Sequence, residues 1–449
     1  MLRLMLSVRP VDKVMLKNLF FYVAQYGIRF LFPLIVTPFL AHVLMKDRFA
    51  DFAIVNSCIW TSSVFMEFGY YLYGVARTGA VGEDRHALAA LVSEIAGSKL
   101  LLAPFAAAAY LALSGWTGVL IRQPAATLIG LVSVLGYGAS FAWYFQGRQR
   151  GMFVVLSEGA PQLVQLMLLL SLVRSPDQLW LVFTLQAIPP VTSLGVGLAA
   201  VMNEGLLGRP SLSTIRRSLS AASPYFFERV CYSTYTSIMP SLIALLATKS
   251  AVADYAIGER FGTFLAGLTL PLTQATMPRV ARLAVSPGGG WGLSVGLVAF
   301  VTGVTVALAG AAAWGAPFVI DRFFSADFGA AGQVAQIFCA TACCSSFGFS
   351  LANFILIPRN RAKIMFWSSS LALVFGLTAQ FALVPRWGAP GAAVGRLISE
   401  GTVALVMALA SLSLWRAEKR RRAPQLPAGA DGSPEESWAA AESTASPKG

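Results

Sequence analysis

Twelve long apolar stretches follow one another along this chain, and they constrain its fold more than any other feature. A helix needs about 20 apolar residues to cross the roughly 30 Å of hydrocarbon in a bilayer. Charged residues make up only 12% of the chain, and the mean hydropathy is +0.66, whereas a soluble domain carries about 25% charged residues. The sequence therefore predicts an all-α integral membrane protein without a separate soluble catalytic domain.

The apolar runs predict where the spans and the other segments lie. The twelve spans are 18–41, 51–73, 88–112, 124–146, 152–173, 178–202, 223–247, 252–277, 292–317, 331–356, 364–385 and 389–413. The predicted segments are a cytoplasmic basic N-terminal segment (1–17), a six-helix lobe (18–202), a cytoplasmic linker (203–222), a second six-helix lobe (223–415) and a cytoplasmic tail (416–449). The tail is too polar to bury a core, so we expect it to be disordered. The basic N-terminal segment leads directly into a long span, which argues against a cleaved signal peptide.

Lysine and arginine are distributed unequally between alternate connections. The connections predicted to lie on the same side of the membrane as both chain ends carry 21 of these cations. The opposite set carries seven, which are Lys46, Arg48, Arg122, Arg174, Lys249, Arg322 and Arg386. Because cytoplasmic loops retain positive charge, both termini are predicted to be cytoplasmic and the number of spans to be even.

A short internal repeat suggests how the helices are organised. Ala-Asp-Phe-Ala-Ile at 50–54 opens the second span and Ala-Asp-Tyr-Ala-Ile at 253–257 opens the eighth, 203 residues later. Val-Ala-Arg closes the same two spans at 75–77 and 280–282. Six helices separate the copies, so the halves would be parallel repeats about an axis along the membrane normal. This predicts two six-helix lobes around a central cavity.

Five basic residues lie inside spans: Arg29, Lys99, Arg229, Arg260 and Arg396. A cation at the centre of a span costs roughly 2.5–3.5 kcal/mol, so it should face water, an acidic partner or an anionic ligand. Arg396 and Glu400 are one turn apart and are expected to pair. For the other four cations we predict substrate binding, with ion pairs between helices as the alternative.

Other polar side chains inside spans have two interpretations each. Tyr26, Tyr232 and Tyr235 are candidates to stack on sugars, and an interfacial aromatic belt is the alternative. Asp51 and Asp254 begin the second and eighth spans, where a carboxylate favours the positive end of a helix. We therefore expect both aspartates to cap helix N-termini.

No motif of an enzyme, nucleotide site or metal site is present. The chain lacks GxxxxGK[ST], HExxH and GxSxG, and its five cysteines form no CxxC pair. The net charge of +13 is not gathered on one solvated face, which argues against nucleic acid as a partner. We expect no enzymatic activity, no cofactor and no metal.

Six segments carry a family resemblance. They are LFPLIVTPFL (31–40), EFGYYLYG (67–74), WYFQGRQR (143–150), PLTQATMPRVARL (271–283), ILIPRNR (355–361) and GAPGAAVGRLISEG (388–401). In this order they resemble the landmarks of Wzx-type polysaccharide-biosynthesis flippases of the MOP superfamily, which also includes MATE drug antiporters. The resemblance covers about residues 14–415. The chain departs from it at Gln149, where the family usually has Glu.

The resemblance implies a function, and the charges inside the spans lead to a hypothesis about which residues would serve it. It implies a flippase that moves an undecaprenyl-pyrophosphate-linked oligosaccharide across the bacterial inner membrane, for O-antigen or exported polysaccharide, with a polysaccharide polymerase and a chain-length regulator as partners. Arg29 and Arg229, with Lys99, would hold the pyrophosphate, and side chains around 233–237 would contact sugars. The ion-coupling candidates are Glu67, Glu228 and Glu259.

Two other functions stay open on the sequence. A MATE-like exporter of small cationic molecules would need an acidic cavity, whereas the charges deepest in the predicted spans are basic. A polysaccharide polymerase would need a larger external loop than the short connections predicted here.

Overall fold

The computed structural model describes residues 13–82, 84–267, 276, 280, 290–324, 326–359, 361 and 363–422. Over these ranges the chain is almost entirely helical and contains no β-strand. The first elements are α2 (Lys13–Glu67), α3 (Tyr70–Val81), α4 (Arg85–Trp116), α5 (Val119–Arg122), α6 (Pro124–Ala139), α7 (Ala142–Gly147), α8 (Gly151–Val154), η1 (Val155–Gly159), α9 (Ala160–Leu172), η2 (Pro176–Gln178), α10 (Leu179–Gln186) and α11 (Ile188–Asn203). They are followed by α12 (Leu212–Thr236), α13 (Met239–Leu246), α14 (Lys249–Gly267), α16 (Trp291–Phe323), η3 (Ala326–Phe328), α17 (Ala331–Leu351), η4 (Ala352–Leu356), η5 (Ile357–Arg359) and α18 (Lys363–Arg422).

Eight helical segments within the described ranges are long and apolar enough to cross a bilayer. Two of them, Leu31–Val81 and Lys363–Arg420, are about twice the usual length. Each is interrupted: Met45 in α2 (φ 59°, ψ 167°) and Gly388 in α18 (φ 59°, ψ −127°) are not helical. Both breaks fall at connections that the sequence predicted, so each double-length segment consists of two helices.

Alternate connections gather at opposite ends of the molecule. At the end that we call the low-cation end, Arg122 and Lys249 both contact Asp51. At the other end, which we call the high-cation end, Arg150 contacts Glu204. These contacts join connections that the charge pattern assigned to the same side, so the predicted alternation agrees with the geometry.

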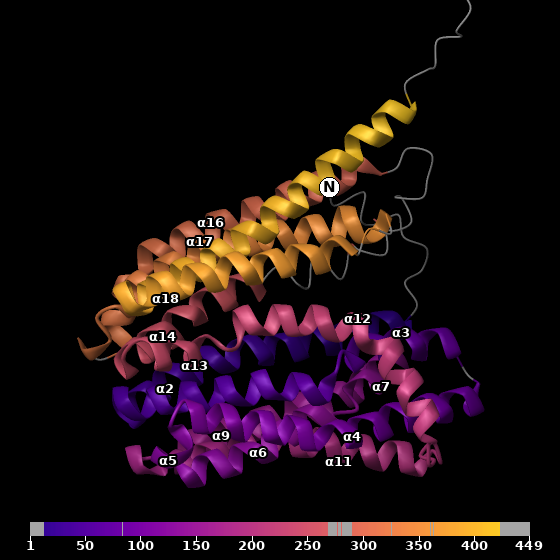
Figure 1. Cartoon of the computed structure of the whole chain (residues 1–449), viewed down its shortest axis with the longest axis horizontal. Helices are drawn as coiled ribbons and strands as arrows, with labels where there is room; N and C mark the ends of the chain where they lie inside the picture. The colour runs from indigo at the N-terminus through magenta and orange to yellow at the C-terminus, as the bar shows by residue number, and fades with distance from the viewer. Residues whose placement is uncertain are drawn as a thin grey trace, which may run out of the picture.

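The helices form two groups whose axes run along the long dimension of the molecule (Figure 1). The first group contains α2 to α11, and α2 contacts α4, α6 and α9 within it. The second group contains α14, α16, α17 and α18, with α17 in contact with the other three. Helix α12 lies between them and contacts α2 and α4 on one side and α18 on the other (Figure 1).

Apolar packing differs between the two ends. At the low-cation end one continuous cluster of buried side chains joins both groups, and it includes Leu40 of α2, Val334 of α17 and Val384 of α18. Three smaller clusters are separate from it, and two of them lie toward the high-cation end. One surrounds Trp143 of α7 and the other surrounds Phe354 of η4. Burial of apolar area therefore holds the groups together mainly at the low-cation end.

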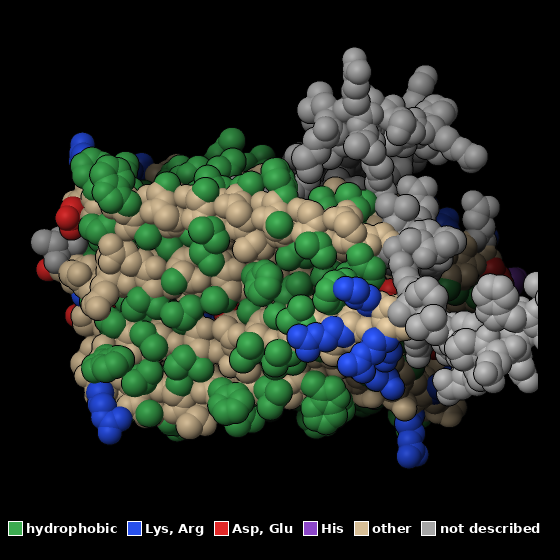
Figure 2. Space-filling view, turned by 90° about the horizontal axis from the view of Figure 1, so that it is seen from above, with side chains coloured by type: hydrophobic (Ala, Val, Ile, Leu, Met, Phe, Trp, Pro, Cys, Tyr) green, Lys and Arg blue, Asp and Glu red, His purple; other side chains and the backbone are tan. Residues whose placement is uncertain are grey.

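The outer surface has the pattern expected of a membrane protein. Figure 2 shows hydrophobic side chains along the middle of one face, with Lys and Arg toward its two ends. Large apolar side chains are exposed on the second group, including Trp314 (89%), Phe318 (73%) and Trp367 (63%). A soluble surface would not expose so many large apolar groups together, whereas a bilayer solvates them.

Candidate functional site

Two ion pairs connect the groups at the low-cation end. Lys46 Nζ lies 3.0 Å from Asp254 Oδ1, and Lys249 Nζ lies 3.0 Å from Asp51 Oδ1. Lys46 and Lys249 are 203 residues apart, and so are Asp51 and Asp254. This is the offset of the internal repeat. Each lysine therefore binds the aspartate of the other copy.

These contacts correct the prediction that Asp51 and Asp254 cap helix N-termini. Asp51 lies inside α2 and Asp254 inside α14, where the backbone N–H groups bond within the helix. Asp51 is 1% exposed and also accepts hydrogen bonds from Arg122 Nε and Gln123 Nε2, each at 3.2 Å. Cations from distant parts of the chain thus satisfy carboxylates that the sequence assigned to local capping.

The seventh predicted span is broken in the middle. Helix α12 ends at Thr236 and α13 begins at Met239, with Pro240 in its first turn. Ser57 Oγ of α2 donates a hydrogen bond to the carbonyl oxygen of Ser237 at 2.6 Å. Backbone groups freed by a broken helix need such partners inside a membrane. The break places polar backbone beside α2, close to the contact between the two groups.

Three predicted substrate-binding cations make no ion pair with any described residue. Lys99 is 5% exposed, and its Nζ donates a hydrogen bond to the carbonyl oxygen of Ser140 at 2.8 Å. Arg229 is exposed on α12, and Arg260 is half-buried on α14 with no hydrogen-bond partner for its Nε. The described ion pairs involve other residues. Among the described residues these three cations therefore lack a direct ion pair, although Glu67, Glu228 and Glu259 interact electrostatically with Lys99, Arg229 and Arg260, respectively.

Arg396 behaves as its spacing predicted. Its Nη2 lies 3.0 Å from Glu400 Oε1, which confirms the expected pair one turn apart. Its Nη1 also donates to the carbonyl oxygen of Tyr235 at 3.0 Å, and its guanidinium lies 5.2 Å from the Tyr235 ring centroid. Arg396 therefore has a direct ion pair, which Lys99 and Arg229 lack among the described residues.

The predicted tyrosines are only partly described. The side chains of Tyr26 and Arg29 lie outside the described residues, although the backbone of both belongs to α2. Tyr232 and Tyr235 have ring centroids 5.4 Å apart in an edge-on contact. Tyr232 is 39% exposed, whereas Tyr235 is 2% exposed. Of these two rings, only Tyr232 presents a surface that a sugar could contact.

The three candidate carboxylates for ion coupling have different surroundings. Glu67 accepts backbone hydrogen bonds from Gly69 at 3.1 Å and Tyr71 at 2.7 Å, so it satisfies free N–H groups at the start of α3. Glu228 and Glu259 are half-buried. Neither forms an ion pair within the described part of the chain. Glu67 thus has a structural role that the sequence did not reveal.

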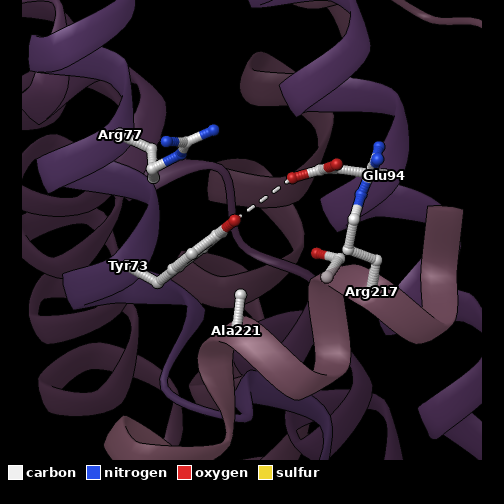
Figure 3. A pocket seen from close by; sticks show the side chains of 6 residues that line it. Tyr73, Arg77, Glu94, Arg217 and Ala221 are labelled. Carbon is white, nitrogen blue, oxygen red and sulfur yellow. Dashed lines mark hydrogen bonds between the residues drawn. The ribbon is translucent and has the colours of Figure 1, made fainter.

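A cavity at the high-cation end was missed by sequence reasoning. Its volume is about 500 Å³, and it is lined by Tyr73, Arg77, Glu94, Arg217, Ser218 and Ala221 (Figure 3). These residues come from α3, α4 and α12, which lie far apart in the sequence. From the sequence, both Arg77 and Arg217 belong to the 21 cations on the side of the chain ends, and neither was a candidate for a site. Their convergence depends on how α12 crosses the first group.

A second cavity of about 480 Å³ lies beside Glu204, also at the high-cation end. Tyr144 Oη donates a hydrogen bond to Glu204 Oε2 at 2.6 Å, and Arg150 binds the other carboxylate oxygen. Burial opposes ionisation of Glu204, but these hydrogen bonds and the charges of Arg150 and Arg148 outweigh it and lower its pKa below the usual value. The carboxylate therefore stays ionised at neutral pH and fixes the turn after α11.

Comparison with known families decides what kind of protein this is. Residues 15–284 match the model of a family described as polysaccharide biosynthesis protein. The chain belongs to this family. The match confirms the resemblance drawn from the six sequence segments.

Two relatives of this polysaccharide biosynthesis protein are candidate O-antigen transporters. The one from Shigella dysenteriae is 25% identical over 407 residues, which cover 88% of this chain and 99% of that protein. The one from Escherichia coli (strain K12) is 21% identical over 277 residues, covering 60% of this chain and 65% of that protein. The chain is therefore a multi-pass membrane protein of the polysaccharide-biosynthesis family, since eight of its described helical segments are long and apolar enough to cross a bilayer.

Solved structures with the same fold are MATE transporters. An inward-facing multidrug resistance MATE transporter of the MOP superfamily has a TM-score of 0.65 at 13% identity, covering 89% of this chain and 100% of that one. An outward-facing one has a TM-score of 0.54 at 12% identity, covering 91% and 96%. These values show that this polysaccharide biosynthesis protein has the fold of the MOP superfamily.

Proposed function

We propose that this chain is a flippase that moves undecaprenyl-pyrophosphate-linked oligosaccharide units across the bacterial inner membrane by ion-coupled alternating access. Its family and its relatives' names support the transport of a polysaccharide precursor. The glycan would serve the synthesis of a surface or exported polysaccharide. The chain would act as a transporter and not as an enzyme, beside a separate polymerase and chain-length regulator.

The proposed architecture has twelve spans in two six-helix lobes, 18–202 and 223–415, with both termini in the cytoplasm. The breaks at Met45 and Gly388 support this count because each separates two helices of spanning length. The excess of cations at the high-cation end supports its assignment to the cytoplasmic side. The low-cation end would then face the periplasm.

One observation carries the proposal of alternating access. The two helix groups share a single apolar cluster at the low-cation end but form separate clusters toward the high-cation end. The reciprocal Lys46–Asp254 and Lys249–Asp51 pairs lie at the joined end. Groups that are joined at one end and separate at the other can rock about a central site. The present state would be open toward the cytoplasm.

Charge supports an anionic substrate. Lys99, Arg229 and Arg260 form no direct ion pair with any described carboxylate. A planar guanidinium binds phosphate oxygens with paired hydrogen bonds, whereas an ammonium acts as a point charge. We therefore assign the pyrophosphate to Arg29 and Arg229 with Lys99 and Arg260 nearby. The polyprenyl chain would remain in the lipid.

The remaining assignments concern the sugars and the coupling ion. Tyr26 and Tyr232, with the hydroxyl groups near the break between α12 and α13, would contact the oligosaccharide. The buried Tyr235 would support the Tyr232 ring by packing against it. Glu228 and Glu259 are the stronger candidates for binding a proton or sodium ion. Glu67 is weaker because backbone N–H groups already occupy both of its oxygens.

Complementation of a deletion strain tests the proposal. We expect Arg29→Ala and Arg229→Ala to abolish export and to cause lipid-linked units to accumulate at the inner face, because the pyrophosphate loses its paired donors. Arg229→Lys should restore export in part, because lysine keeps the positive charge but lacks the paired N–H donors of a guanidinium. Arg209→Ala, at an exposed position between α11 and α12, is the matched control and should export normally.

The outcomes separate the competing functions. Native export by the Arg229→Ala variant would refute the pyrophosphate assignment. Accumulation of unpolymerised units at the outer face of the deletion strain would indicate a polymerase. Normal export together with lost tolerance to organic cations would indicate a MATE-like exporter.

A further inference from the structure

The cavity lined by Arg77 and Arg217 has the size and composition of a ligand site. Its volume of about 500 Å³ lies within the range of roughly 300–1,000 Å³ that is usual for small-molecule sites. In Figure 3, Tyr73 and Arg77 extend from α3 toward Glu94 of α4 and Arg217 of α12. Three helices thus direct ionisable side chains into one space.

The cavity has a buried polar floor. Glu94 is 9% exposed and Tyr73 is 8% exposed, and the Tyr73 hydroxyl donates a hydrogen bond to Glu94 Oε1 at 3.4 Å. Ser218 is 1% exposed, and its hydroxyl lies 3.3 Å from that of Tyr70. Carboxylate and hydroxyl groups of this kind both accept hydrogen bonds from sugar hydroxyls.

The rim of the cavity is cationic. Arg77 and Arg217 are exposed, and neither forms an ion pair with any residue that the structure describes. Two guanidinium groups face one carboxylate, so the cavity has an excess positive charge. The Glu94 carboxylate would repel an anion from the floor. An anionic group would therefore bind at the rim, between the two arginines.

We infer that this cavity binds a phosphate-linked sugar, with the phosphate between Arg77 and Arg217 and the sugar hydroxyls on Glu94 and Tyr73. The inference rests on the proposed function and adds a second substrate site to it. Arg217 precedes Arg229 on α12 by twelve residues, or about 18 Å along a helix. The cavity would thus receive the headgroup at the cytoplasmic mouth before it reaches the cations at the centre.

Binding to the full-length protein in lipid nanodiscs tests this inference. The probe is geranyl-diphosphate-linked N-acetylglucosamine, and geranyl diphosphate without sugar is the comparison. Arg77→Ala and Arg217→Ala should each weaken binding of the sugar-bearing probe about tenfold or more, as expected for lost charge-assisted hydrogen bonds. Glu94→Gln should instead reduce the preference for the sugar-bearing probe over the sugarless one.

One further variant separates the effect of the cavity's space from that of its charge, and two more serve as controls. Ala221→Phe fills the space without removing a charged group, and it should also weaken binding of the sugar-bearing probe. Arg216→Ala and Ser220→Phe change exposed neighbours on α12 that do not line the cavity. Both controls should bind the probe with native affinity.

The result that would overturn the inference is native affinity in the Arg77→Ala, Arg217→Ala and Ala221→Phe variants. Equal loss for both probes, with phosphatidylglycerol competing equally well, would also overturn it, because a lipid headgroup would then be the ligand. Neither result bears on the proposed function, which is tested separately by export in the Arg229→Ala variant.

Discussion

At the scale of single residues, buried cations in this protein are satisfied in two different ways. Arg396 has a carboxylate one turn away on the same helix. Lys99 donates a hydrogen bond to the carbonyl oxygen of Ser140 and interacts with Glu67 through space, but it forms no direct ion pair with a described residue although it is 5% exposed. A buried charge without a paired opposite charge is unfavourable for folding. We therefore propose that an anionic ligand supplies the remaining compensation at Lys99.

We expect Lys99→Met to stabilise the protein while impairing transport. Replacing a poorly compensated buried charge with an apolar side chain of similar length is neutral or stabilising by about 1–4 kcal/mol. Thermal unfolding in detergent should therefore occur at an equal or higher temperature, whereas export in cells should fall. A variant that unfolded at lower temperature, with export unchanged, would show that Lys99 serves only the fold.

Glu204 provides a prediction about pH. Its pKa is lowered in the folded protein, so its ionised form contributes stability above the ordinary pKa of Glu, about 4.3. That contribution is lost as the pH falls through the lowered folded-state pKa. The unfolding temperature should therefore drop below about pH 4 in the native protein and less steeply in Glu204→Gln. Parallel curves for the two proteins would contradict this assignment.

At the scale of elements, small residues set how closely helices approach. Gly258 of α14 faces α17 so closely that an added Cβ would lie 2.4 Å from Val334 Cγ1 and 2.8 Å from the backbone nitrogen of Ala335. Gly74 of α3 similarly faces the Trp143 ring, 2.5 Å from where its Cβ would be. Close approach at glycine supports helix packing within membranes.

We expect Gly258→Ala to destabilise the second helix group by about 1–3 kcal/mol, because the backbone of α17 has to move. Gly296→Ala in α16 is the matched control, since nothing lies within 4 Å of its added Cβ. The control should be neutral or stabilising by up to about 1 kcal/mol through helix propensity. Unfolding temperatures of the two variants give the comparison, and equal effects would contradict the packing explanation.

The sequence predicted most of what depends on nearby residues. Apolar run lengths predicted the breaks at Met45 and Gly388, and the spacing of Arg396 and Glu400 gave their ion pair. They did not predict the break of the seventh span between α12 and α13. The capping prediction for Asp51 was wrong because its lysine partner is 198 residues away.

The cavity of Arg77, Glu94 and Arg217 was missed for a similar reason. Its lining combines three helices, and the hydrophobic pattern gives no information on how they cross. The side chains of Arg29 and Tyr26 lie outside the described residues, so their roles stay predictions from the sequence.

At the scale of the whole molecule, the two ion pairs at the low-cation end are equivalent under the repeat. The Lys46 and Asp254 side chains are 17% and 6% exposed, and those of Lys249 and Asp51 are 35% and 2% exposed. Removing Lys46 would leave the buried Asp254 without its cation, which is unfavourable, whereas Asp51 would keep Arg122 if Lys249 were removed. The pairs should thus help to keep this end closed.

We expect Lys46→Asp to lower the free energy of unfolding by about 1–3 kcal/mol and to reduce export. Adding Asp254→Lys should recover part of both losses, because the pair is restored with its charges exchanged. Lys249→Asp with Asp51→Lys should behave in the same way, although Arg122 also contacts Asp51.

The exposed Arg48–Asp177 pair offers a matched control. Its side chains are 37% and 85% exposed, and exposed pairs contribute only about 0–1 kcal/mol. Arg48→Asp should therefore have little effect on unfolding or on export. Strictly additive effects of Lys46→Asp and Asp254→Lys would show that the cross-group pair does not couple the two residues.

The reciprocal pairing has a consequence for how such a protein could have arisen. In a two-fold symmetric dimer, a residue of one subunit meets a different residue of the other, and the same contact then occurs twice. Lys46 with Asp254 and Lys249 with Asp51 repeat this arrangement within one chain. A half-length ancestor with a single lysine and a single aspartate at these positions would have formed both bridges as a homodimer, so gene duplication and fusion would have preserved an existing interface.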